Sequence, residues 1–168
     1  RDSLFTMRDL NDANSIEAFM KSGMRLLIVG GGYIGLEAAA TARKFGVDVT
    51  LVEIEERILK RVAAKETSDY IRSLHISNGV KIKEAIGLDK LEIVGEKVLN
   101  ASLTDGSNIN VDFVIVGIGI TPNTYLAEGA NLKINNGILI NEKCQTSVSN
   151  IYACLLYTSP SPRDWLQS

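Results

Sequence analysis

The first half of the chain alternates between continuous apolar runs and segments whose apolar residues lie three or four positions apart. A continuous run predicts a strand buried on both faces, whereas the wider spacing predicts a helix. We therefore expect helices at 12–22, 34–45 and 64–78, and strands at 24–29, 47–52 and 80–82. Because strands alternate with helices, the pattern favours a parallel sheet covered on both faces.

Residue types at the ends and on the faces of these helices add detail. Asn14 or Ser15 is expected to cap the first helix, and Gly23 is expected to end it. The third helix is expected to carry one apolar face, formed by Tyr70, Ile71 and Leu74.

Residues 90–110 have a different pattern, in which apolar and polar side chains alternate. Turn signals interrupt the alternation at 95–96 and 104–107, and the second contains an Asp-Gly pair, which is typical of a hairpin. We expect a small antiparallel meander here, followed by a buried strand at 113–116 that ends at Gly117-Ile118-Gly119. The predicted fold class is α/β: a Rossmann-type parallel sheet with helices on both faces and an antiparallel β-meander crossover.

Composition and charge narrow the function classes. The chain has 168 residues, of which 45% are hydrophobic and 23% are charged, as in an ordinary globular domain. Its formal net charge of −2, with both signs interspersed, argues against a nucleic-acid-binding protein. No apolar run has the length of a membrane span and no signal-peptide segment is visible, so we expect a cytoplasmic protein that does not bind membranes.

The residues that usually bind metals or form disulfides are few. Cys144 and Cys154 are too far apart for a C-x-x-C motif, and His75 is the single histidine. We therefore expect two reduced, buried cysteines and no metal site.

The candidate chemistry lies at Gly30-Gly31-Gly32-Tyr33-Ile34-Gly35, which fits G-x-G-x-x-G. In a dinucleotide-binding turn the first glycine allows the tight turn, the second lets the pyrophosphate approach the backbone, and the third lets the helix pack against the sheet. The pyrophosphate then meets the free N–H groups and the positive dipole end of the helix. Because a buried strand precedes the motif and a helix follows it, we expect a dinucleotide site.

An acidic residue at the end of the second strand, Glu53, is placed to accept hydrogen bonds from the adenosine ribose hydroxyls. A 2′-phosphate at about 4 Å from this carboxylate would cost on the order of 4 kcal/mol at an effective dielectric near 20. Glu55 and Glu56 add to this repulsion, and Arg57 and Arg61 offset part of it. We therefore expect NAD(H) as the ligand rather than NADP(H).

Residues 30–37, Gly-Gly-Gly-Tyr-Ile-Gly-Leu-Glu, are similar to the NAD-binding turn of the FAD-dependent pyridine nucleotide-disulfide oxidoreductases. The resemblance extends over about residues 4–154. Segments 104–106, 112–119 and 121–123 resemble the far edge of that domain, and 136–142, 145–147 and 151–154 resemble the return into the FAD domain. Residues 56–62 and His75 resemble the ferredoxin reductase-like branch, which includes rubredoxin and putidaredoxin reductases.

This resemblance implies a flavoprotein that passes a hydride from NADH to FAD and then single electrons to a small iron–sulfur or rubredoxin-type partner. It assigns the pyrophosphate to the glycine loop, the ribose to Glu53, and the nicotinamide end to Glu37 and the second glycine segment. The implied cofactor-binding residues are Gly30, Gly31, Gly32, Tyr33, Ile34, Gly35, Glu37, Glu53, Gly117, Ile118 and Gly119. No residue of the chain is expected to act as acid, base or nucleophile.

The same resemblance suggests how the chain is organised. We expect a linking helix at 1–22, the NAD-binding domain at 23–125, the start of the return into the FAD domain at 126–154, and a non-native or disordered tail at 155–168. In the family, the segment like 151–154 continues into a Gly-Asp pair that binds FAD, but here Leu155-Leu156-Tyr157 follows. We therefore expect a fragment that binds NADH and does not turn it over without FAD.

Two other functions fit parts of the pattern. One is a non-catalytic, NAD-responsive interaction protein similar to apoptosis-inducing factor, built on the same scaffold. The other is a nucleoside-binding methyltransferase, which also has a glycine turn and an acidic residue after the second strand. The meander and the segment 117–123 argue against the methyltransferase.

Overall fold

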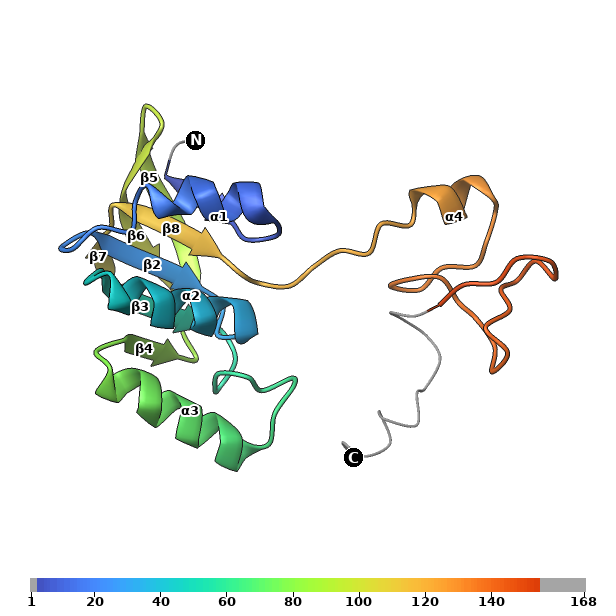
Figure 1. Ribbon diagram of the computed structural model, residues 1–168, viewed down its shortest axis with the longest axis horizontal. Helices are drawn as coiled ribbons and strands as arrows, with labels where there is room; N and C mark the ends of the chain where they lie inside the picture. Colours follow the sequence, from blue (N-terminus) through green and yellow to red (C-terminus); the bar gives the residue numbers. More distant parts are fainter. Residues whose placement is uncertain (1–2, 155–168) are drawn as a thin grey trace. The chain divides into compact units, whose positions relative to one another are not determined.

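A computed structural model describes residues 3–154, which fall into two compact units that divide between Ile118 and Gly119. The tail predicted at 155–168 lies outside the described residues. The first unit contains a five-stranded parallel sheet and a three-stranded antiparallel sheet (Figure 1). Within residues 3–154, no helix combines the length and the apolar character that crossing a membrane requires.

The parallel sheet has the strand order β1-β8-β2-β3-β4. Its strands are β1 (Leu4–Thr6), β8 (Phe113–Val116), β2 (Arg25–Val29), β3 (Asp48–Glu53) and β4 (Lys81–Glu84). Four of them confirm predicted strands to within one or two residues at each end. The sequence did not predict β1, because three residues are too few for a periodic pattern. This strand forms by pairing with β8, with Leu4 opposite Val114.

The three-stranded sheet is the predicted meander, formed by β5 (Leu88–Val94), β6 (Lys97–Leu103) and β7 (Asn108–Asn110) in antiparallel pairing. It connects β4 to β8, where a helix would otherwise cross over, so the fold class is confirmed. The meander also supplies a covering layer. Val98, Ala101 and Leu103 pack against Leu27, Val52 and Val114 of the parallel sheet.

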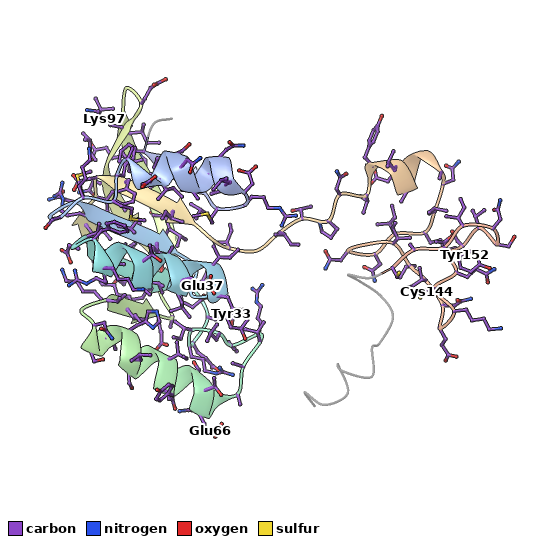
Figure 2. The ribbon with its side chains drawn as sticks, viewed as in Figure 1. Tyr33, Glu37, Glu66, Lys97, Cys144 and Tyr152 are labelled. Atoms are coloured by element: carbon purple, nitrogen blue, oxygen red, sulfur yellow. The ribbon has the colours of Figure 1, made fainter. Side chains whose placement is uncertain are left out.

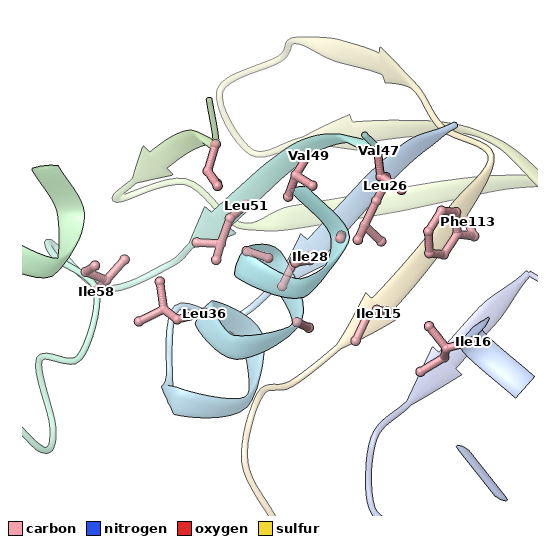
Figure 3. Close-up of a cluster of buried hydrophobic side chains, with 14 of the residues drawn as sticks. Ile16, Leu26, Ile28, Leu36, Val47, Val49, Leu51, Ile58, Phe113 and Ile115 are labelled. Carbon is pink, nitrogen blue, oxygen red and sulfur yellow. The ribbon is translucent and has the colours of Figure 1, made fainter. Parts of the chain in front are cut away.

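The helices α1 (Leu10–Glu17), α2 (Tyr33–Lys44) and α3 (Lys65–Ser77) belong to the other layer. The core on this side is shown in Figure 3, and its sheet residues are Leu26, Ile28, Val49, Leu51, Phe113 and Ile115. The expectation of helices on both faces is therefore corrected in one respect. Helices cover one face and the meander covers the other, because the alternating apolar side chains of β6 bury that face themselves.

The first helix begins earlier than predicted and has a different cap. Asp9, not Asn14 or Ser15, is the N-cap, since its carboxylate accepts hydrogen bonds from the backbone N–H groups of Asn11 and Asp12. The Asp12 carboxylate in turn accepts from the N–H of Asp9, which completes a capping box. The helix ends before Gly23 is reached.

On α3, the predicted apolar face is only partly used. Ile71 packs against the core, but Tyr70 is 67% exposed and Leu74 is 45% exposed. The buried residue of this helix is Ser68, whose hydroxyl donates a 2.6 Å hydrogen bond to the carbonyl of Ile58. The helix is therefore attached partly through a polar contact, which an apolar pattern does not reveal.

Among its described residues, 119–154, the second unit has one short helix, α4 (Tyr125–Gly129), and two isolated antiparallel bridges, Ile134 with Ile138 and Gln145 with Tyr152. Backbone hydrogen bonds close its turns, among them Asn141 N–H to Gln145 O and Ala153 N–H to Cys144 O.

Candidate functional site

The glycine loop joins the end of β2 to the start of α2 and contacts the end of β8. Gly30 has φ +111°, and a Cβ there would lie 2.3 Å from the carbonyl oxygen of Gly117. A Cβ on Gly35 would lie 2.1 Å from the carbonyl oxygen of Gly30. Both distances are far below van der Waals contact, so backbone packing by itself requires glycine at these two positions.

Gly32 occupies a different environment. Its φ is −80°, and a Cβ there would meet nothing within 4 Å. It is the N-cap of α2 but has no side chain to bond the first N–H groups, and no acidic residue lies in the first turn. An uncapped helix start of this kind presents free N–H donors and positive dipole charge to open space. It can therefore accept an anion such as a phosphate.

Glu53 places a carboxylate beside this loop. One oxygen accepts a 2.6 Å hydrogen bond from the N–H of Gly31, and the other accepts a 2.8 Å bond from the N–H of Glu55. The side chain is half-buried at the end of β3. Because each carboxylate oxygen has more than one acceptor position, both can also receive hydroxyl donors from a ligand.

Gly31, a variable position of the motif, also has no room for a side chain. A Cβ there would lie 2.7 Å from Cγ2 of Ile58 and 3.1 Å from Oε2 of Glu53. Its carbonyl accepts a 3.0 Å bond from the N–H of Leu59, a residue with φ +55°. The N–H of Gly31 is thus bonded to Glu53 at the end of β3, and its carbonyl is bonded to Leu59 in the segment that follows β3.

Two residues that the sequence did not single out hold this segment in place. Ile58 donates its N–H to Oε1 of Glu84 at 3.0 Å, and its carbonyl accepts from Ser68. The second oxygen of Glu84 accepts from Nε of Arg72 at 2.8 Å. Glu84 and Ser68 are distant from the glycine motif in sequence and share no spacing with it, so no motif could have identified them.

The other predicted site residues are more exposed. Tyr33 is 59% exposed and Ile34 is 46% exposed, both in the first turn of α2. Glu37 lies one turn further along α2 than Tyr33 (Figure 2), and these two side chains line a cavity of about 250 Å³ together with Leu59 and Ile71. The cavity lies between α2 and α3.

The second glycine segment divides between the two units. The N–H of Gly117 donates to the carbonyl of Val29 at 2.8 Å, which places it next to the glycine loop. Ile118 is the last residue of the first unit and is 70% exposed. Gly119 is the first residue of the second unit and has φ +116°. Because it belongs to the other unit, its role in the site stays a prediction.

Ion pairs surround the segment after Glu53. Glu55 binds Nζ of Lys60 at 3.0 Å and Nη2 of Arg61 at 3.4 Å, and Lys60 also lies 3.6 Å from Glu56. The hydrogen bond from Lys60 lowers the pKa of Glu55, and the bond to Glu55 raises the pKa of Lys60. Both shifts favour the charged forms of Glu55 and Lys60.

The sequence model of the family described as "Pyridine nucleotide-disulphide oxidoreductase" matches residues 1–154. The chain belongs to this family. Among curated proteins, it is 41% identical over 151 residues to the 5,5'-dehydrodivanillate O-demethylase ferredoxin reductase subunit of a Sphingobium species, covering 89% of this chain and 37% of the relative. It is 42% identical over 143 residues to the putidaredoxin reductase of Pseudomonas putida, covering 84% of this chain and 34% of that relative.

Comparison with a solved structure gives the same family for this chain. The structure of a covalent putidaredoxin reductase–putidaredoxin complex matches with a TM-score of 0.83 and 40% identity, covering 87% of this chain and 36% of that chain. The chain thus spans about a third of the length of the relatives it matches. The predicted resemblance and its ferredoxin reductase-like branch are confirmed.

The two cysteines of the chain lie in the second unit and are free. Cys144 is half-buried and Cys154 is exposed, so the expectation that both are buried is wrong. Cys144 lies at a bend and Cys154 lies outside any helix or strand.

Proposed function

We propose that the glycine loop and Glu53 bind NAD(H), and that the chain is the NAD-binding part of an NADH-dependent FAD flavoprotein reductase. In this proposal electrons pass from NADH via FAD to a small ferredoxin- or rubredoxin-type acceptor. The observation that carries it is the open space at Gly32, in front of an uncapped helix and beside the Glu53 carboxylate. The relatives named as ferredoxin and putidaredoxin reductases support the choice of reaction and partner.

The residues at the site fit the proposed ligand. The pyrophosphate is assigned to the first turn of α2, where free N–H groups face the open position. Glu53 is assigned to the adenosine ribose, since its carboxylate is already fixed by two backbone N–H groups. Glu37 is assigned to the nicotinamide end, and Tyr33 and Ile34 are assigned to the border of the bound cofactor.

The second glycine segment, 117–119, is assigned to the same end of the ligand as Glu37. The bound nicotinamide supplies a hydride for the flavin, and the contribution of this chain is to bind and orient it. A ligand with a 2′-phosphate is expected to bind less well, because the phosphate would meet the charge of Glu53.

The domain boundaries follow from the same proposal. Residues 23–125 are assigned to the NAD-binding domain, and 1–22 and 126–154 to segments that connect it to an FAD domain. The residues that would hold FAD lie mostly beyond the third of the reductase length that this chain spans. A cytoplasmic location belongs to this proposal as well. The alternative resembling apoptosis-inducing factor has no support among the relatives reported above.

A direct binding measurement tests the proposal. Titrating the 168-residue chain with NADH and following NADH fluorescence is expected to give saturable binding, and S-adenosylmethionine is expected not to compete. The chain alone is expected not to reduce an acceptor dye with NADH. Binding of S-adenosylmethionine without NADH binding, or dye reduction without added flavin, would contradict the proposal.

A further inference from the structure

The segment after β3 holds as many cations as carboxylates in a short length of chain. Nine residues, 53–61, contain three acidic and three basic side chains: Glu53, Glu55, Glu56, Arg57, Lys60 and Arg61. The segment begins at the carboxylate assigned to the ribose. The arrangement of its cations therefore bears on which dinucleotide binds.

Glu55 holds two of these three cations. Its carboxylate binds Lys60 at 3.0 Å and Arg61 at 3.4 Å, while its backbone N–H donates to Glu53 at 2.8 Å. Glu55 is thus adjacent to the ribose carboxylate and directs both cations to its own side chain. Arg57 is engaged elsewhere, since its Nη2 donates to the carbonyls of Lys60 and Ala63.

The two cations are able to move if they are released. The side chain of Arg61 is 75% exposed and that of Lys60 is 39% exposed, and each is a long, rotatable chain. Binding a 2′-phosphate needs charge-assisted partners, and Arg and Lys provide them in other phosphate sites. Here the phosphate would have to compete with Glu55 for both.

We propose that Glu55 is a specificity-determining residue that withholds Lys60 and Arg61 from the 2′-phosphate of NADP(H). The inference rests on the proposed NAD(H) site. It adds a second cause of discrimination to the direct repulsion from Glu53. Glu55 acts through its two partners rather than by touching the ribose.

The test is a comparison of NADH and NADPH binding by the 168-residue chain and its E55Q variant. E55Q is expected to bind NADPH about fivefold more tightly, the combined effect of releasing two surface ion pairs, with NADH affinity unchanged within about twofold. E56Q is the matched control: it removes the same charge from a neighbouring side chain that is 70% exposed and reaches only Lys60, at 3.6 Å. Its expected change is below about twofold.

Two further variants separate the outcomes. K60Q/R61Q in the presence of Glu55 is expected to leave NADPH affinity unchanged, and E55Q/K60Q/R61Q is expected to lose the gain of E55Q. Equal gains in E55Q and E56Q, or a gain that survives without the two cations, would overturn the inference. Should circular dichroism show that E55Q does not fold, a loss of NADPH affinity in K60Q/R61Q would overturn it instead. An unmutated chain that binds neither dinucleotide would refute the proposed function rather than this inference.

Discussion

The carboxylate of Glu53 accepts a 2.6 Å hydrogen bond from the backbone N–H of Gly31. This contact joins the end of β3 to the glycine loop across twenty-two positions of sequence. The segment that follows Glu53 closes the connection, because Leu59 donates to the carbonyl of Gly31 at 3.0 Å. The proposed phosphate and ribose positions are therefore parts of one hydrogen-bonded unit.

Replacing Glu53 by glutamine is expected to weaken NADH binding about tenfold, because a neutral amide accepts weaker hydrogen bonds from the ribose than a carboxylate does. The measurement is a fluorescence titration with NADH. Glu66→Gln, on the exposed first turn of α3 (Figure 2), is the control and is expected to bind like the unmutated chain. Equal affinities for both variants would remove Glu53 from the site.

Alanine at Gly32 is expected to weaken NADH binding, whereas alanine at Gly30 is expected to destabilise the fold. Gly32→Ala adds a methyl group where nothing lies within 4 Å, so folding should be unaffected while NADH affinity falls at least about tenfold. Gly30→Ala would place its Cβ 2.3 Å from the Gly117 carbonyl at φ +111°, so it should destabilise the fold by about 3 kcal/mol. Urea unfolding together with NADH titration measures both effects. If Gly32→Ala bound NADH normally, the open space would not be the pyrophosphate position.

Removal of the Ser68 hydroxyl is expected to destabilise the chain by about 2 kcal/mol, because the buried carbonyl of Ile58 would lose its partner. The midpoint of urea unfolding for Ser68→Ala measures this. Ser73→Ala is a matched control on the same helix. The Ser73 hydroxyl donates to the exposed backbone carbonyl of Asp69, so its removal should leave the stability nearly unchanged. Similar midpoints for the two variants would show that the hydrogen bond from Ser68 to the carbonyl of Ile58 does not contribute to stability.

The ion pair between Asp112 and Arg25 makes stability depend on pH. Asp112 accepts from the backbone N–H of Arg25 at 2.7 Å and from its guanidinium at 2.7 and 3.0 Å, and the guanidinium bonds lower the pKa of Asp112. A carboxyl with a lowered pKa in the folded state stabilises the fold above its ordinary pKa, and this stabilisation is lost as the pH falls through the folded value.

Asp112→Asn is therefore expected to lose about 1 kcal/mol at pH 7, a modest value because the partner guanidinium is partly exposed. The difference from the unmutated chain should shrink as the pH is lowered below about 4. Urea unfolding at pH 7 and pH 3 measures both quantities. A difference that grows toward acid pH would contradict the assignment.

Part of this structure could be predicted because its signals are local. Parallel strands that are buried on both faces need continuous apolar runs, which is why 24–29, 47–52 and 113–116 were recognised. The alternation at 90–110, with its Asp-Gly turn, likewise predicted the meander. The G-x-G-x-x-G motif and Glu53 were found because their spacing and their strand–turn–helix context lie within one stretch of sequence.

Other features depended on contacts between distant parts of the chain. Strand β1 exists because β8 offers it a partner. Glu84 and Ser68 acquire their roles only where β4 and α3 meet the segment after β3.

The sequence by itself determined the order of the elements from α1 to β8, the position of the glycine loop and the acidic residue opposite it, because each follows from residue type and local spacing. Only the tertiary structure decided that the meander covers the second face, that Gly31 has no room for a side chain, and that Glu55 holds Lys60 and Arg61. These depend on distances between segments that approach one another only when the chain has folded.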